Sequence, residues 1–328
     1  MTMRQFVTYF TSFLISVVAF GQTEVDLSQL EFERTSNKSA VYTQYSAKTK
    51  LSASASSKNQ IRLDLGAGSA EAVHSQDGRL KAKAEIVLSV KNKNRISKEL
   101  EDLELYIEED GESLKLVSTF DYQESNRKEI SGGFFSSPER KVNIKVYVPQ
   151  NIKVRLKDRS GDLEINGISN DLQVSDGSGA IRIDNLNGNL DLKDNSGEIS
   201  IANMNQNADP GEFTVRVRDS SGGIYLKDIN GDTEIDDSSG DIEVTNIGGK
   251  LTIDDTSGSI VAKNIGGDSK VVDTSGEISV YSVQGSVTIY DTSGGIYVDT
   301  VTEDVTLKRD GSGSFVTKNI EGKIVKRG

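Results

Sequence analysis

A Ser-Gly dipeptide that returns at a nearly constant spacing is the feature that most constrains how this chain folds. Within residues 160–313 it occurs nine times, and the spacings between successive copies are 18, 18, 25, 18, 18, 18, 18 and 19. An aspartate stands two positions before each serine, so the repeated unit is Asp-x-Ser-Gly. The serines are Ser160, Ser178, Ser196, Ser221, Ser239, Ser257, Ser275, Ser293 and Ser312. A fixed period of roughly 20 residues is typical of solenoids.

Five positions of each unit are almost always apolar, and their spacing indicates the local structure. Counted from the serine as position 1, positions 4, 6, 9, 13 and 15 are apolar in 41 of 45 cases. Positions 4 and 6 flank a polar residue, as in Ile242 and Val244, and so do positions 13 and 15, as in Leu251 and Ile253. Alternation with period two indicates strands with one buried face. Each unit therefore holds two short strands and two turns.

The second turn is of the Asn/Asp-Ile-x-Gly kind, as in the turns that begin at Asp228, Asn246 and Asn264. Gly and Asn are suited to the positive φ of such corners. Two strands per unit fit either a hairpin meander or a parallel solenoid. Because the same residues recur at the same phase, the sequence favours stacking of each unit on the next copy.

We therefore expect an all-β fold, a right-handed parallel β-solenoid of about nine 18-residue coils, preceded by a small β-rich N-terminal domain. Val154 and Leu156 share the phase of positions 13 and 15, so they should begin the stack half a coil early. The spacing of 25 marks an insertion at Asn205–Gly211.

Residues 1–21 have the pattern of a secretory signal peptide. Arg4 precedes an uncharged, mostly apolar stretch from Phe6 to Phe20, and Ala19-Phe20-Gly21 offers small residues for cleavage. The expected domains are a signal peptide at 1–21, a β-rich region at 22–149 that is partly flexible over 22–60, and a solenoid at 150–328. We expect export to the periplasm, the cell surface or the exterior, with no membrane span after signal removal.

The N-terminal region carries less regular signals. Residues 48–59 resemble an exposed loop or a weak strand, and Ser97–Leu100 a short helical turn with Ser97 as its N-cap. Glu109-Asp-Gly-Glu112 predicts a hairpin turn. Strands are expected at Gln60–Leu65, Lys81–Val90, Leu103–Ile107, Ser113–Phe120 and Val142–Val148. We expect this region to cover the first coil, since an open solenoid end exposes strand edges.

Composition excludes several classes of protein. The chain has no cysteine and one histidine, which excludes disulfides, thiol catalysis, Cys-ligated metals and His-cluster sites. The net charge is −12, and residues 150–328 hold 30 acidic and 18 basic residues. Such an excess of acid disfavours nucleic acid as a partner.

Three stretches resemble a known family, the β-strand-repeat proteins described as adhesins and as domain of unknown function 4097. They are the strand Val142–Pro149 that ends in Val-Pro, the Ser160–Ile165 unit with its copies, and the acidic-Gly strand at Glu108–Val117. The resemblance covers about 80–328 well and 22–80 poorly. It implies an exported β-solenoid with an adhesin-like or envelope-scaffold role, and no catalytic residues.

The stacked aspartates allow two interpretations. Neighbouring carboxylates one coil apart would repel each other, so calcium held between coils by Asp219, Asp237, Asp255, Asp273 and Asp291 is one hypothesis. The other is an Asx-turn, in which each aspartate accepts from the backbone N–H of the Ser or Gly beyond it. We favour the Asx-turn and expect no cofactor.

An enzymatic function has little support in the sequence. The single insertion brings Asp209 and Glu212 near each other without a basic residue, which is the weak basis for a glycan-cleaving activity. His74 lies beside an expected turn and is interpreted as a solvated loop residue.

Aromatic side chains on the outer faces are the candidate contact residues for a partner. By phase, Tyr225, Tyr281, Tyr290 and Tyr297 point outward, together with Val261 and Val272. They could bind a sugar or a protein, or pack across strands. Phe134 and Phe135 form a contact site or plug the core near the first coil. The sequence therefore predicts a non-enzymatic, exported solenoid that presents an acidic surface to an unidentified protein or glycan.

Overall fold

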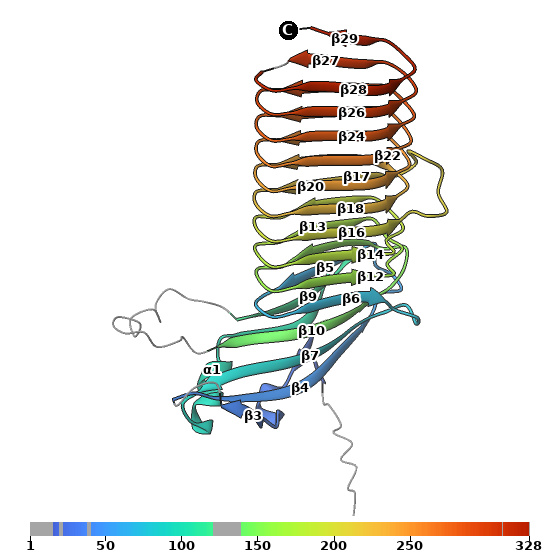
Figure 1. Ribbon diagram of the computed structural model, residues 1–328. Coiled ribbons are helices and arrows are strands. Elements are labelled where there is room, and N and C mark those ends of the chain that lie inside the picture. The colour runs from blue at the N-terminus through green and yellow to red at the C-terminus, as the bar shows by residue number, and fades with distance from the viewer. Residues whose placement is uncertain (1–15, 20–21, 38–40, 121–138, 310, 328) are drawn as a thin grey trace, which may run out of the picture.

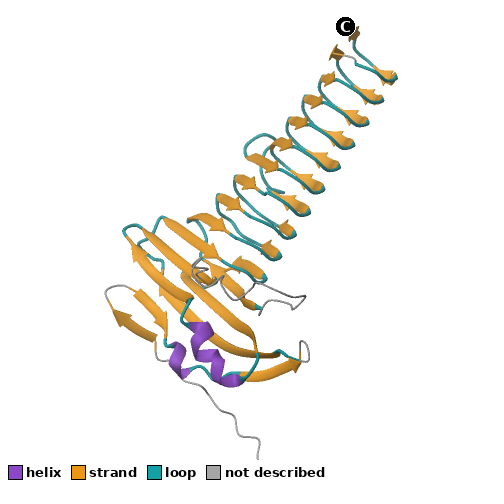
Figure 2. Ribbon diagram, turned by 90° about the vertical axis from the view of Figure 1, so that its left-hand side faces the viewer, coloured by secondary structure: helices purple, strands orange, loops and turns teal. Residues whose placement is uncertain are grey.

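The structure is a long rod of stacked coils with a broader β-rich region at one end (Figures 1 and 2). It is a computed structural model, and it describes residues 16–19, 22–37, 41–120, 139–309 and 311–327. Its described strands form two sheets, of 15 and 14 strands. We name them the first and the second sheet.

Every coil contributes one strand to each sheet, and all neighbouring strands of the coils pair in parallel. The first sheet contains β11 (Lys153–Lys157), β13 (Leu172–Ser175), β15 (Leu190–Lys193), β17 (Thr214–Asp219), β19 (Asp232–Asp237), β21 (Leu251–Asp255), β23 (Ser269–Asp273), β25 (Val287–Asp291), β27 (Val305–Arg309) and β29 (Ile324–Lys326). The second contains β12 (Leu163–Asn166), β14 (Ile181–Asp184), β16 (Ile199–Met204), β18 (Ile224–Ile229), β20 (Ile242–Ile247), β22 (Ile260–Ile265), β24 (Ile278–Val283), β26 (Ile296–Val301) and β28 (Phe315–Ile320).

The register of these strands follows the repeat. Leu251 pairs with Ser269, and Ile242 with Ile260, so each position pairs with its own copy in the next unit. Leu190 pairs with Val215 across the longest spacing, because the insertion leaves the sheet between β16 and β17 and returns in phase. The parallel solenoid is confirmed, and the hairpin meander is wrong.

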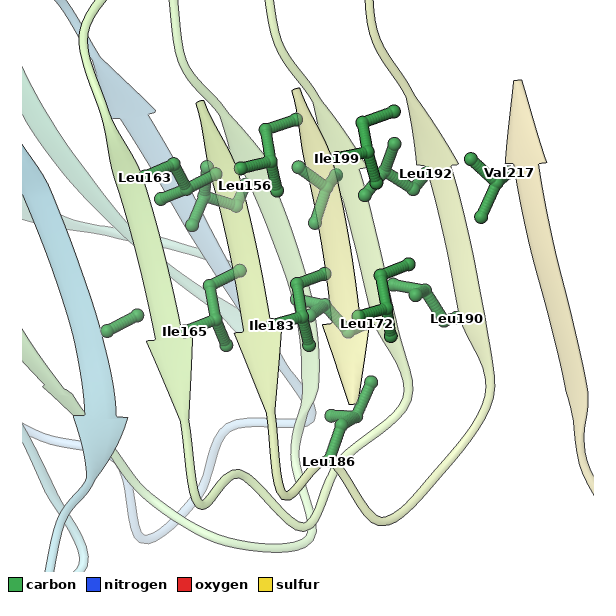
Figure 3. Packing of buried hydrophobic residues seen from close by; sticks show 14 of the residues in the cluster. Leu156, Leu163, Ile165, Leu172, Ile183, Leu186, Leu190, Leu192, Ile199 and Val217 are labelled. Carbon is green, nitrogen blue, oxygen red and sulfur yellow. The ribbon is translucent and has the colours of Figure 1, made fainter. Parts of the chain in front are cut away.

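The predicted apolar columns form the core between the two sheets. Ile253 and Val244 are fully buried, and the side chains of the two sheets face each other along the rod (Figure 3). Val154 and Leu156 are buried on β11, so the stack does begin half a coil early. Even the loss of one methyl group is costly in such a core, because neighbouring coils cannot close around the gap independently.

The N-terminal region continues both sheets of the solenoid. Its strands are β2 (Gln22–Val25), β3 (Glu33–Asn37), β4 (Thr43–Ser54), β5 (Gln60–Leu65), β6 (Ala70–His74), β7 (Arg79–Val90), β8 (Leu103–Asp110), β9 (Ser113–Phe120) and β10 (Arg140–Val148). β5 pairs with β11, and β6 pairs with β12, both in parallel. The first coil is therefore covered as expected, and one hydrophobic cluster runs through both parts.

Some local expectations change. The 48–59 segment is strand as far as Ser54, because β4 pairs along its whole length with β7. The helical turn is α1 (Ile96–Leu100), and two short 3₁₀ turns precede it, η1 (Leu27–Gln29) and η2 (Lys93–Arg95). Ser97 is not its N-cap: Arg95 holds that position without a side-chain bond, because the helix continues directly from η2.

Two further expectations concern the ends of this region. The hairpin turn is confirmed, with Gly111 at φ 58° between Asp110 and Ser113. Within the predicted signal peptide, β1 (Ser16–Ala19) pairs antiparallel with β2, and cleavage stays a prediction. Among the residues that the structure describes, no helix has the length and apolarity to cross a membrane.

Candidate functional site

The repeated aspartates lie inside the rod, at the corner where each first-sheet strand ends. Asp255, for example, closes β21 with its side chain on the buried face and is 1% exposed. We call this column the aspartate ladder: Asp158, Asp176, Asp194, Asp219, Asp237, Asp255, Asp273 and Asp291, all buried. The sequence contained the signal for this orientation, because each aspartate stands two positions after position 15 and shares its inward phase.

One oxygen of each carboxyl is bound to the turn. Oδ1 of Asp255 accepts from the backbone N–H of Ser257 at 3.1 Å, and Oδ1 of Asp273 from that of Ser275 at 3.0 Å. In the first two coils the donor is the next residue, as in Arg159 N–H to Asp158 at 2.8 Å. The bonds from Ser257 and Ser275 are those that the Asx-turn interpretation predicted, and in the first two coils the donor lies one residue earlier.

The second oxygen is buried without such a bond in seven members of the ladder. These are Oδ2 of Asp158, Asp176, Asp194, Asp219, Asp237, Asp255 and Asp273, none of which has a hydrogen-bond partner among the described residues. A buried anion without a partner is costly, so the neutral acid is favoured. The ladder is thus a column of acceptors with no donors of its own.

Burial and the neighbouring carboxyls raise the pKa values of the ladder. Burial, followed by the charge of Asp176, raises the pKa of Asp158 to about 7. Burial raises the pKa of Asp237 and Asp255 to about 6, with the next aspartate along the column adding to the effect. These buried carboxyls are therefore protonated at higher pH than ordinary aspartates are.

The geometry of the ladder gives calcium few ligands. A calcium site needs six to eight oxygens, whereas one oxygen of Asp219, Asp237, Asp255, Asp273 and Asp291 is occupied by the turn. Among the described residues no group of three or more His, Cys, Asp or Glu side chains could hold a metal ion. The calcium hypothesis stays a prediction.

Only two of the four candidate tyrosines come together. Tyr281 on β24 and Tyr297 on β26 have ring centroids 5.4 Å apart at 42°. The hydroxyl of Tyr297 donates to Asp299 Oδ2 at 2.9 Å, and the ammonium of Lys318 lies 5.2 Å from its ring. We call these four residues the tyrosine site.

The other two tyrosines lie elsewhere. Tyr225 is 40% exposed on β18, three strands away from β24 in the second sheet. Tyr290 is on β25 of the first sheet, beside Val272 on β23, with the ammonium of Lys270 6.0 Å from its ring. The repeat contained the signal for this separation, because Tyr290 falls on the second strand of its unit and Tyr225 lies three units before Tyr281.

The remaining sequence candidates do not assemble into a reactive group. His74 is the half-buried last residue of β6, so its interpretation as a solvated loop residue is wrong. The backbone N–H of Asp209 donates to a carboxyl oxygen of Glu212 at 3.3 Å, which makes this pair a turn contact in an exposed loop. Phe134 and Phe135 lie outside the described residues.

Comparison with known proteins gives one family and several solved structures. The family model described as Toastrack DUF4097 matches residues 59–265. A "putative lipid binding protein" from Parabacteroides distasonis is 14% identical, with 85% of this chain and 96% of that chain covered at a TM-score of 0.38. A "putative adhesin" from Bacteroides fragilis is 13% identical, with the same coverage at a TM-score of 0.24. A search of curated proteins finds no match.

Proposed function

Because this chain belongs to the Toastrack DUF4097 family, we propose that it is an adhesin-like, non-enzymatic binding protein that works outside the cytoplasm. The matched residues run from β5 of the N-terminal region to β22 of the solenoid. The predicted signal peptide supports a place in the periplasm, on the cell surface or beyond it.

The observation that carries this proposal is the tyrosine site on the distal second sheet. Tyr281 and Tyr297 stand on the outer face of parallel strands, where Tyr281 lies opposite Lys263 on β22 and Tyr297 opposite the 41% exposed Val316 on β28. Tyrosine is enriched among the central contacts of interfaces. The face thus offers an aromatic anchor to a protein or a glycan.

The charge of the solenoid supports a partner with a basic component. Residues 150–328 carry 30 acidic and 18 basic residues, and Asp299 lies within the tyrosine site itself. An acidic surface steers a basic partner toward it. A contact at the distal part of the rod leaves the N-terminal region outside the interface with the partner.

The proposal is tested by binding of the fluorescently labelled chain, residues 22–328, to whole cells and isolated envelopes of the producing organism. We expect saturable binding that falls about tenfold or more in the variant Tyr281→Ala/Tyr297→Ala, since two anchoring aromatics are removed. Tyr225→Ala is the matched control, because this tyrosine is exposed on the same sheet and stacks on no other described ring.

Two results would contradict the proposal. Equal binding by the double variant and the wild-type chain would remove the tyrosine site from the contact. An absence of saturable binding to any cell or envelope fraction would remove the adhesin-like function itself. A circular dichroism melt of each variant establishes that the solenoid is intact.

A further inference from the structure

The outer face of the first sheet near the N-terminal region is basic, although the chain as a whole is acidic. On β11, Lys153, Arg155 and Lys157 all point outward and are exposed, in strict alternation with buried Val154 and Leu156. Adjacent strands add further outward cations. We call the following residues the basic face: Arg62, Lys153, Arg155, Lys157, Lys193, Arg216 and Arg218.

The strand register places like charges directly opposite one another. Arg155 lies opposite Arg62 on β5, and Lys193 opposite Arg218 on β17. Such pairs destabilise a sheet. The same registers also hold two opposite-charge pairs, Lys157 with Asp64 and Arg216 with Asp191. The stability of the sheet therefore does not explain the two like-charge pairs.

Four cations of the basic face form no salt bridge within the part of the chain that the structure describes. Arg62, Arg216 and Arg218 form ion pairs with Asp110, Glu234 and Asp191 at 2.8–2.9 Å. The remaining four are Lys153, Arg155, Lys157 and Lys193. Their charges are available to a ligand.

The same sheet changes sign further along the rod. In the fully described strands from β19 to β25, the outward charged residues include Glu234, Asp236 and Asp254, and Lys270 is the one cation among them. The boundary falls between β17 and β19, where Arg216 pairs with Glu234. Cations thus predominate on the outward face as far as β17, give way to carboxylates on β19 and β21, and return on β27, where Lys308 and Arg309 are exposed.

A shallow hollow of about 420 Å³ lies on this face, across β11, β13, β15 and β17. Lys153, Arg155 and Arg216 line it together with hydrogen-bonding side chains, which are Gln60, Gln173, Asn189 and Thr214. Its two carboxyls are already engaged: Asp171 accepts from the amide of Asn189 at 3.0 Å, and Asp191 from Arg218 at 2.8 Å. The hollow therefore presents two cations without a salt bridge among the described residues, Lys153 and Arg155, beside neutral polar groups and the carboxylate of Asp171.

We propose that the basic face binds an acidic glycan, a sugar chain that carries carboxylate, sulfate or phosphate groups. The cations complement its charges, and the amide and hydroxyl side chains suit its hydroxyl groups. None of the described residues that line the hollow is aromatic, so it lacks the stacking platforms of single-strand nucleic-acid sites. Its apolar lining residues, Val154, Leu172 and Leu190, are buried, so none of them can insert into a membrane surface.

This inference goes beyond the proposed function, because it assigns a second ligand to the opposite sheet of the rod. Its test measures binding of the chain, residues 22–328, to polygalacturonate and dextran sulfate, with neutral dextran as the uncharged probe. We expect binding to an acidic probe, weakened by salt, and none to neutral dextran. The variant Lys153→Gln/Arg155→Gln removes two cations that line the hollow and should bind about tenfold more weakly.

Lys270→Gln/Lys308→Gln is the matched control, since it removes the same charge from the same sheet beyond the boundary and should change affinity less than about twofold. Equal loss in both variants, or no binding to either acidic probe, would overturn the proposal. Tighter binding to single-stranded DNA or to phosphatidylglycerol vesicles would overturn the glycan assignment. Tyr281→Ala/Tyr297→Ala should leave binding to the acidic probe unchanged, which keeps this test separate from that of the adhesin-like function.

Discussion

At both corners of each coil, polar side chains stack one coil apart, but the two corners differ in how these side chains form hydrogen bonds. At the corner opposite the aspartate ladder, Asn246, Asn264 and their equivalents adopt positive φ, and Asn264 Nδ2 donates to Asn246 Oδ1 at 2.9 Å. An amide carries both a donor and an acceptor, so that column satisfies itself. A carboxylate has acceptors only, so the aspartate ladder needs protons. The ladder is therefore the corner whose buried carboxyls have raised pKa values.

The largest expected effect is the pH dependence of stability. The folded-state pKa values of Asp158, at about 7, and of Asp219, Asp237, Asp255 and Asp273, at about 6, lie above the ordinary value of 3.8. Groups with raised folded-state pKa values stabilise the fold fully below about pH 4 and lose that contribution as the pH rises through 6–7. We expect a lower melting temperature at pH 8 than at pH 5, measured by circular dichroism. A melt that is unchanged, or higher at pH 8, would contradict the ladder's protonation.

The next largest effect is expected from replacing glycines, and the loss of stability should differ between the two corners. A Cβ on Gly258, beside the ladder, would overlap the carbonyl oxygen of Gly240 in the previous coil. A Cβ on Gly167, at the other corner, meets nothing within 4 Å, although its φ is also positive. Gly258→Ala should cost about 3 kcal/mol or more and Gly167→Ala about 1 kcal/mol, by urea denaturation. Similar costs would mean that the coils can separate at the ladder.

Exchanging the two side-chain types tests the comparison directly. Asp255→Asn removes a buried charge and supplies a hydrogen-bond donor. It should therefore raise the free energy of unfolding at pH 8 by about 1 kcal/mol. The free energies of unfolding at pH 5 and at pH 8 should then differ less than they do in the wild-type chain. Asn264→Asp replaces the donor to Asn246 by an anion at an exposed position and should cost about 0.5–1 kcal/mol at pH 8. If Asp255→Asn destabilised the chain at pH 8, the carboxylate would have a partner that the structure does not show.

Calcium should have the smallest effect. Because the turn already occupies one oxygen of each ladder aspartate, we expect the melting temperature to change by no more than about 1 °C between millimolar calcium and chelator. A strong rise with calcium that disappears in Asp237→Asn/Asp255→Asn would establish the metal hypothesis instead.

The solenoid was predictable because one pattern specifies it repeatedly. Ile242 and Val244 alternate with polar residues in the same phase as their copies in the next unit, so strand, face and register follow from the sequence alone. The N-terminal region repeats nothing, and the Ser- and Lys-rich β4 is a strand only because it pairs with β7 along its whole length. Tertiary pairing decided that segment, and local propensity did not.

The candidate surfaces were less predictable than the fold. The burial of the ladder follows from the phase of Asp255 after Ile253, yet Asp-x-Ser-Gly in isolation indicates only a turn. The basic face joins Arg62 to Arg218 through parallel pairing of strands far apart in sequence. The net charge of −12 is a sum over the whole chain, so it does not reveal a local cluster of cations.

Because every coil pairs with the next at the same residues, the length of the rod is independent of the chemistry at either end. Removing Ser239–Thr256, one full unit, would bring Ser257 into the place of Ser239 and preserve all columns. It would shorten the rod by one strand spacing, about 4.8 Å. The basic face near the N-terminal region and the tyrosine site beyond it would stay intact and move closer together. The number of repeats therefore sets the distance between the two proposed binding surfaces without changing either of them.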